Sequence, residues 1–106
     1  MYSRVFTAQV QPGKLDQAID MYRQLELSFQ KQKGFLGGTL RVDRATNKVV
    51  GIASFETRAD LEALETSEWY QEMFAKESKQ LLVGQPTTES YEVVHRIQSV
   101  RQVGGA

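Results

Sequence analysis

Few side chains of this 106-residue chain have the chemistry of a catalyst. There is one histidine, His95, and there is no cysteine, which excludes a thiolate nucleophile, a disulfide and a thiolate metal site. Because an imidazole can accept or donate a proton near neutral pH, His95 is the candidate catalytic residue. The competing interpretation is a histidine packed in a sheet or at a dimer interface. A single imidazole predicts no metal site.

Aromatic side chains form the second group of candidates. Trp69 and Tyr70 could stack on a flat aromatic ligand held between a helix and a sheet. Aromatic residues at helical spacing also belong to hydrophobic cores, so both interpretations stay open. The candidate substrate-binding residues are Trp69, Tyr91, Phe6, Tyr22 and Phe74.

Charged residues give weaker signals. Arg4, Arg41 and Arg96 lie in predicted strands, where they could hold an anionic substrate through paired hydrogen bonds. We favour surface or dimer ion pairs for them. The acidic residues of the second half resemble a solvated helix face rather than paired catalytic carboxylates. They are Glu62, Glu65, Glu68 and Glu72.

Length and charge limit the class of function. The chain fits one domain, residues 1–106, with no room for separate cofactor and substrate domains. Thirteen Lys and Arg balance thirteen Asp and Glu, which disfavours nucleic acid and anionic membrane surfaces as partners. No segment approaches the ~20 apolar residues that a membrane span needs. Together with the absence of cysteine, this leads us to expect a cytoplasmic protein.

Hydrophobic periodicity predicts the secondary structure. Alternation predicts strands at residues 3–10, 36–43, 49–56 and 87–97. Three- and four-residue spacing predicts a helix over residues 14–32 that ends at Gly34. Helical pieces should begin at Thr57, through a capping box with Asp60, and at Ser67, and they could form one bent helix. The tail, residues 98–106, offers nothing to bury and should fray.

The Gly37-Gly38 pair in the second strand has two interpretations. It could mark a β-bulge or a close approach of another backbone. We favour ordinary turn geometry.

This order of elements predicts an α+β fold, the ferredoxin-like split βαβ arrangement with an antiparallel sheet and helices on one face. The strands carry apolar residues in both alternation sets, for example Val5 beside Phe6 and Val50 beside Val49. The face of the sheet without helices therefore also carries apolar residues, and pairing with another copy of the chain would bury them. We expect a homodimer.

The chain resembles, over nearly its whole length, the antibiotic biosynthesis monooxygenase-like group of the dimeric α+β barrels. The similarity lies in the segments 10–14, 34–37, 55–57 and 67–70. It implies pairing into a dimeric α+β barrel. Its members include cofactor-independent oxygenases of quinol-like aromatics and haem-degrading enzymes. The asparagine, tryptophan and histidine of the haem-degrading pattern fall on Phe6, near Leu64 and near Phe74, so haem chemistry is not indicated.

The leading hypothesis is a cofactor-independent monooxygenase acting on a small, flat, quinol-like aromatic. The protein would supply a dry pocket, a proton acceptor and stabilisation of developing charge, with His95, Trp69 and Tyr91 as the candidates. The alternative is a non-catalytic small-molecule-binding or interaction module on the same dimeric scaffold, and an isomerase or decarboxylase also stays open. A large, partly polar cavity would favour an enzyme, and a filled one a structural role.

Overall fold

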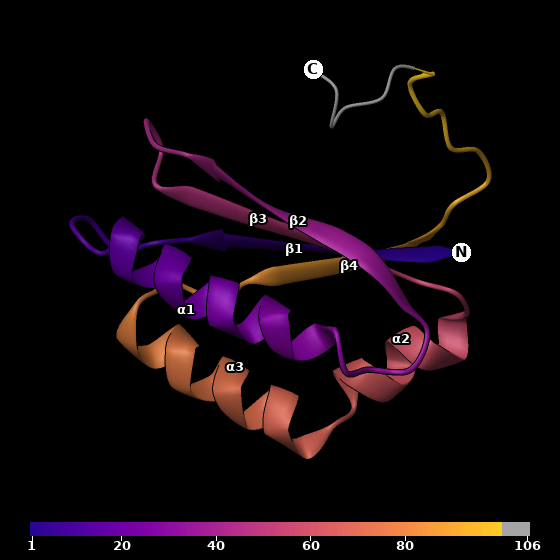
Figure 1. Cartoon of the computed structure of the whole chain (residues 1–106). Helices are drawn as coiled ribbons and strands as arrows, with labels where there is room; N and C mark the ends of the chain where they lie inside the picture. Colours follow the sequence, from indigo (N-terminus) through magenta and orange to yellow (C-terminus); the bar gives the residue numbers. More distant parts are fainter. Residues whose placement is uncertain (101–106) are drawn as a thin grey trace.

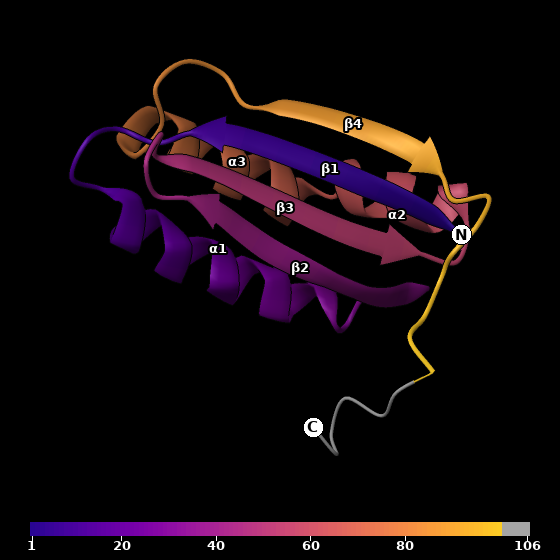
Figure 2. The same ribbon diagram turned by 90° about the horizontal axis from the view of Figure 1, so that it is seen from above.

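The computed structural model of the chain describes residues 1–100. Its strands are β1 (Tyr2–Gln9), β2 (Phe35–Asp43), β3 (Lys48–Phe55) and β4 (Thr87–Glu92). Its helices are α1 (Leu15–Phe29), α2 (Arg58–Glu65) and α3 (Glu68–Gln80). The strands pair antiparallel in the order β2-β3-β1-β4. The helices all lie on one side of the sheet (Figure 1), and Figure 2 shows the sheet lying across them. The predicted ferredoxin-like arrangement is confirmed.

Alternation along β1 divides the two faces of the sheet. Arg4, Phe6 and Ala8 are buried on the helix side. Val5 lies opposite Ile52 of β3 on the other side, because paired residues of antiparallel strands share a face. Both are only half-buried, and no helix of residues 1–100 covers them. Within one chain, the hydrophobic core therefore lies only on the helix side of the sheet.

The two helical pieces of the second half are separate helices. As predicted, the Thr57 hydroxyl caps α2 by accepting a hydrogen bond from the Asp60 backbone amide at 3.1 Å. Ser67 occupies the N-cap position of α3, but its hydroxyl donates to the Leu64 carbonyl at 2.6 Å. The side-chain cap that the sequence predicted at Ser67 is therefore not formed, because the end of α2 uses the same hydroxyl.

Turn geometry was the wrong interpretation of Gly37 and Gly38. The pairing of β2 with β3 shifts register between Phe35 and Gly37, where the strand bulges. A Cβ at position 38 would clash with the Ile52 carbonyl oxygen. A close approach of the β3 backbone therefore requires glycine at this position.

The last strand is shorter than predicted. β4 ends at Glu92, and after one further hydrogen bond, from the Val93 amide to the Met1 carbonyl at 2.8 Å, the described chain up to residue 100 forms no helix or strand. Ile97 is 84% exposed. Most of the predicted fraying tail, residues 101–106, lies outside the described residues. None of the helices in residues 1–100 is long and apolar enough to cross a membrane.

Candidate functional site

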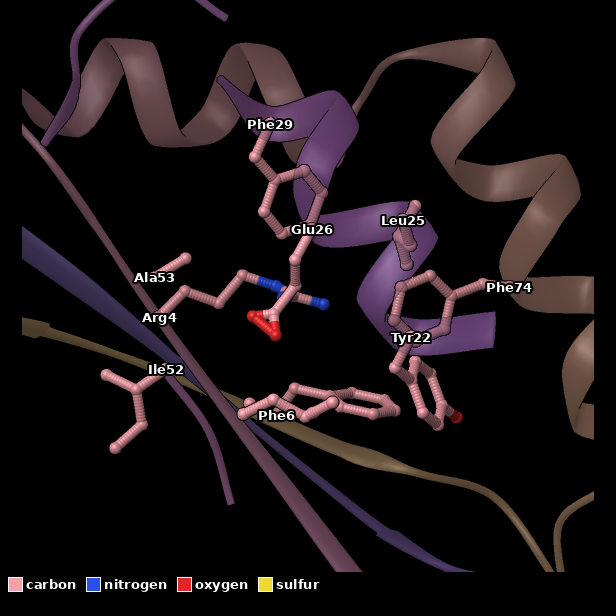
Figure 3. A pocket seen from close by; sticks show the side chains of 11 residues that line it. Arg4, Phe6, Tyr22, Leu25, Glu26, Phe29, Ile52, Ala53 and Phe74 are labelled. Atoms are coloured by element: carbon pink, nitrogen blue, oxygen red, sulfur yellow. The ribbon is translucent and has the colours of Figure 1, made fainter. Parts of the chain in front are cut away.

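A small cavity lies between the helix side of the sheet and α1 (Figure 3). Its walls come from four elements besides α1: β1, β2, β3 and α3. Its volume is about 20 Å³, which is room for about one water molecule. The lining residues are Arg4, Phe6, Tyr22, Leu25, Glu26, Phe29, Leu40, Gly51, Ile52, Ala53 and Phe74. Side chains thus fill most of the space between helix and sheet.

Arg4 brings a positive charge to this apolar cavity. Only 3% of the residue is exposed. The central carbon of its guanidinium lies 4.9 Å from the ring centroid of Tyr70 and 5.4 Å from those of Phe6 and Phe74. At these distances the rings attract the cation. The expectation was a surface or dimer ion pair, and the surface position is wrong for Arg4, because the residue is buried and its ion-pair partner is Glu65 of the same chain. Arg41 and Arg96 are exposed.

The buried guanidinium keeps unused hydrogen-bond donors. Its Nε lies 3.8 Å from Glu65 Oε2, and neither Nε nor Nη2 makes a hydrogen bond to any residue of the described chain. Burial lowers the pKa of Arg4 to about 10, although the charges of Glu65 and Glu26 oppose the change. The group is therefore a cation at neutral pH. An anionic oxygen in the cavity would satisfy donors whose isolation costs about 1–3 kcal/mol each.

Glu26 is the second charged residue of the cavity. In Figure 3 its carboxylate and the Arg4 guanidinium both point into the space enclosed by the apolar side chains. Burial raises the pKa of Glu26, and the charge of Arg4 opposes this effect. A half-buried carboxylate with a raised pKa is suited to accept a proton from a bound ligand. Glu26 was not predicted from the sequence, although it lies between Tyr22 and Phe29 on the apolar side of α1.

A buried acidic group lies behind the cavity wall. Glu77 of α3 is 1% exposed, and neither of its carboxyl oxygens has a hydrogen-bond partner among residues 1–100. Burial raises the pKa of Glu77 to about 7, and the nearby Tyr22 hydroxyl opposes the shift. Burial, and then the charge of Glu77, in turn raise the pKa of Tyr22. Tyr22 also lines the cavity around Arg4, so its side chain lies between this cavity and Glu77.

The structure brings together only part of the predicted site. Phe6, Tyr22 and Phe74 line the cavity, and Phe6 packs against both of the other rings, with centroids 5.2 and 4.9 Å apart. Trp69 lies instead in a groove between α1 and α3.

The other two candidates lie at the end of the described chain. Tyr91 is 50% exposed on β4, where its hydroxyl donates to Glu89. His95 is exposed in the segment after β4. Their roles stay predictions. Within residues 1–100, no group of three or more His, Asp or Glu side chains could hold a metal ion.

Comparison with known proteins gives one family and many similar folds. Residues 1–76 match the sequence model of the family described as antibiotic biosynthesis monooxygenase. A solved structure of an antibiotic biosynthesis monooxygenase is 19% identical, has a TM-score of 0.75, and the match covers 90% of this chain and 100% of that one. A proposed antibiotic biosynthesis monooxygenase from Nitrosomonas europaea is 14% identical, with a TM-score of 0.77 and the same coverage, 90% and 100%.

A third solved structure, a proposed antibiotic biosynthesis monooxygenase from Deinococcus radiodurans, is 8% identical with a TM-score of 0.81. This match covers 95% of this chain and 100% of that one. At such identities the likeness establishes the fold alone. No curated protein is similar enough in sequence to match.

Proposed function

Because this chain belongs to the antibiotic biosynthesis monooxygenase family, we propose that it oxidises a small, flat, quinol-like aromatic without a metal or an organic cofactor. The observation that carries the proposal is Arg4, a buried cation with two unused donor nitrogens, held among aromatic rings beside a cavity. The site combines an anion-binding group with surfaces on which a flat ring can stack.

The proposed chemistry uses the substrate itself as the reductant of oxygen. Glu26 takes the proton of a phenolic hydroxyl, and the Arg4 guanidinium stabilises the resulting anion. Dioxygen then adds to a ring carbon that bears hydrogen, forming a carbon–oxygen bond and a peroxide anion. Protonation of the peroxide and loss of water leave one oxygen atom in the product as a carbonyl. Exclusion of bulk water strengthens the interaction of Arg4 with each anion.

Substrate binding requires the cavity to widen. Its volume of about 20 Å³ is smaller than an aromatic ring. Leu40 and Phe74, two residues of its wall, are only partly buried and can move with less loss of packing than fully buried residues. Gly51 adds no side chain to the β3 wall of the cavity, which Ala53 also lines.

Oxygen uptake with a panel of quinols and anthrone-like phenols under air tests the proposal, with labelled dioxygen to show one labelled atom in the product. Arg4→Met keeps an unbranched apolar stem and removes the guanidinium with its charge. We expect kcat to fall by about 10²–10³, as for the loss of an electrostatic donor. Arg41→Met, a change of an exposed arginine on β2, is the matched control. Absence of turnover with the folded wild-type chain, or full activity of Arg4→Met, contradicts the proposal.

A second pair of variants tests which residue accepts the proton. Glu26 lines the cavity, whereas His95, the candidate from the sequence, is exposed after β4. We expect Glu26→Gln to slow turnover and to remove the lower-pH limb of the rate profile, and His95→Gln to leave the rate unchanged. The reverse result would return the role to His95 and remove Glu26 from the mechanism.

We also propose that the chain works as a homodimer in the cytoplasm. The open face of the sheet, with the half-buried apolar residues Val5, Val50 and Ile52, supports the pairing. The absence of cysteine supports the compartment. Native mass spectrometry of Val50→Lys should show monomer where the wild type shows dimer. Ala63→Lys, on the exposed side of α2, should leave the mass unchanged. A monomeric wild type would refute the pairing.

A non-catalytic binding module is the second candidate, and the small size of the cavity is the observation that favours it. Such a module would retain an aromatic ligand in native mass spectrometry, lose it in Arg4→Met, and consume no oxygen with any quinol tested.

A further inference from the structure

A second hollow lies on the helical side of the molecule, between α1 and α3. The two helices run side by side beneath the sheet (Figures 1 and 2) and border a groove of about 760 Å³. This volume is in the range of small-molecule sites. Of the residues that line the groove, only Leu25 also lines the cavity around Arg4. The groove is therefore separate from the site of the proposed oxidation.

The groove has an apolar wall and an unpaired acid. Met21 of α1 faces Trp69 and Met73 of α3 across it, and all three are only partly buried. Glu77 also lines the groove, and no described residue donates a hydrogen bond to either of its oxygens. A buried carboxyl without a donor is unfavourable. A donor brought by a ligand would remove this penalty.

The charges around the groove favour a cation. Two acidic residues, Glu72 and Glu77, and one basic residue, Lys76, belong to its lining. Glu72 and Lys76 are exposed at the rim, so water screens them, whereas Glu77 is 1% exposed. An indole ring and two thioethers are surfaces that suit the apolar body and the charge of an organic cation.

We propose that the groove between α1 and α3 binds a small organic amine, whose ammonium group pairs with Glu77 while its apolar body packs against Met21, Trp69 and Met73. The carboxyl oxygens are covered by neighbouring atoms in the unliganded chain. A change of side-chain rotamer at Glu77 brings them to the groove when the amine enters.

Fluorescence tests this proposal directly, because Trp69 is the only tryptophan of the chain. The probe is phenethylamine, and 2-phenylethanol is its neutral counterpart of similar shape. With the wild-type protein we expect saturable change of Trp69 fluorescence by the amine, with an affinity about tenfold or more above that of the alcohol, as one good ionic contact provides. This comparison needs no variant.

A variant then assigns the contact to one carboxyl. Glu77→Gln should weaken phenethylamine binding about tenfold and leave 2-phenylethanol unchanged. Glu72→Gln, a carboxyl at the rim of the same groove, should change amine affinity by less than about twofold, since exposed ion pairs contribute little. Equal affinities for amine and alcohol, an unchanged Trp69 signal, or full amine affinity of Glu77→Gln each overturn the proposal. None of these results depends on oxygenase activity.

Discussion

Replacement of Glu77 by Gln should stabilise the protein at alkaline pH. In the folded chain the Glu77 carboxyl is buried without a hydrogen-bond partner in residues 1–100, and burial raises its pKa from 4.5 to about 7. Glutamine has a similar shape and cannot ionise. The substitution therefore removes the burial of a charge and leaves packing nearly unchanged.

The direction and size of this change in stability follow from proton linkage. Between pH 4.5 and about 7 the folded chain holds a proton on Glu77 that the unfolded chain has lost, so the free energy of unfolding falls as pH rises through this window. A shift of this size corresponds to at most about 3 kcal/mol above pH 7, because each pKa unit is worth about 1.4 kcal/mol. Below pH 4.5 the penalty is absent. The free energy of unfolding of Glu77→Gln should thus equal that of the wild type below pH 4.5 and exceed it above pH 7.

Urea unfolding followed by circular dichroism at pH 5 and pH 8, at one protein concentration, measures this difference. Glu72→Gln on the same helix is the control, since its side chain is exposed and surface changes stay within about 0.5 kcal/mol. A Glu77→Gln protein that is less stable than wild type at pH 8 would refute the reasoning. A stability difference that does not change between the two pH values would refute it as well.

Three further predictions test the fold and the cavity. Thr57→Ala removes the hydroxyl that accepts from the Asp60 amide at 3.1 Å, and urea unfolding should show a loss of about 1 kcal/mol. Gly34→Ala should destabilise more than Gly13→Ala: both glycines have φ near +80°, at +79° and +81°, but only position 34 would place Cβ against Asp60, 2.6 Å from its Cγ. Equal losses would contradict this. Gly51→Ala places a methyl group 3.8 Å from Phe6, so it should retain stability and raise KM for the aromatic substrate.

The sequence was sufficient to predict the fold, because the alternation of the strands and the spacing of α1 are set by burial on one face of the sheet. Arg4 shares the alternation set of Phe6 and Ala8, which the structure buries, but apolar residues in both sets left the buried side of the strand open. The prediction of a surface position came from residue type, because charged side chains are rarely buried without a partner. Glu77 was missed for the same reason, although it lies between Phe74 and Leu81 at helical spacing.

Other features could not be predicted from one chain. The cavity depends on the register of β1, β2 and β3 together, and a shift by one residue would turn Arg4 to the other face. The end of β4 at Glu92 is not marked in the sequence, because Val93 to Ile97 continue the same alternation. Whether these residues extend a strand depends on a pairing edge, which the local pattern does not specify.

Arg4 and Glu77 are opposite charges buried in one core, yet they do not pair. The charge of Glu77 raises the pKa of Tyr22 and the charge of Arg4 lowers it. The tyrosine side chain is therefore close enough to both groups to interact with each. A core selected for stability alone would join such charges or replace them with apolar residues, since an unpaired buried charge is more costly than either. Exceptions to this rule concentrate at functional sites. Arg4 has one ion-pair partner, Glu65 at 3.8 Å, but two of its donor nitrogens make no hydrogen bond, and neither oxygen of Glu77 makes one within residues 1–100. These unsatisfied groups are the basis of the two proposals, an anion beside Arg4 and a cation beside Glu77.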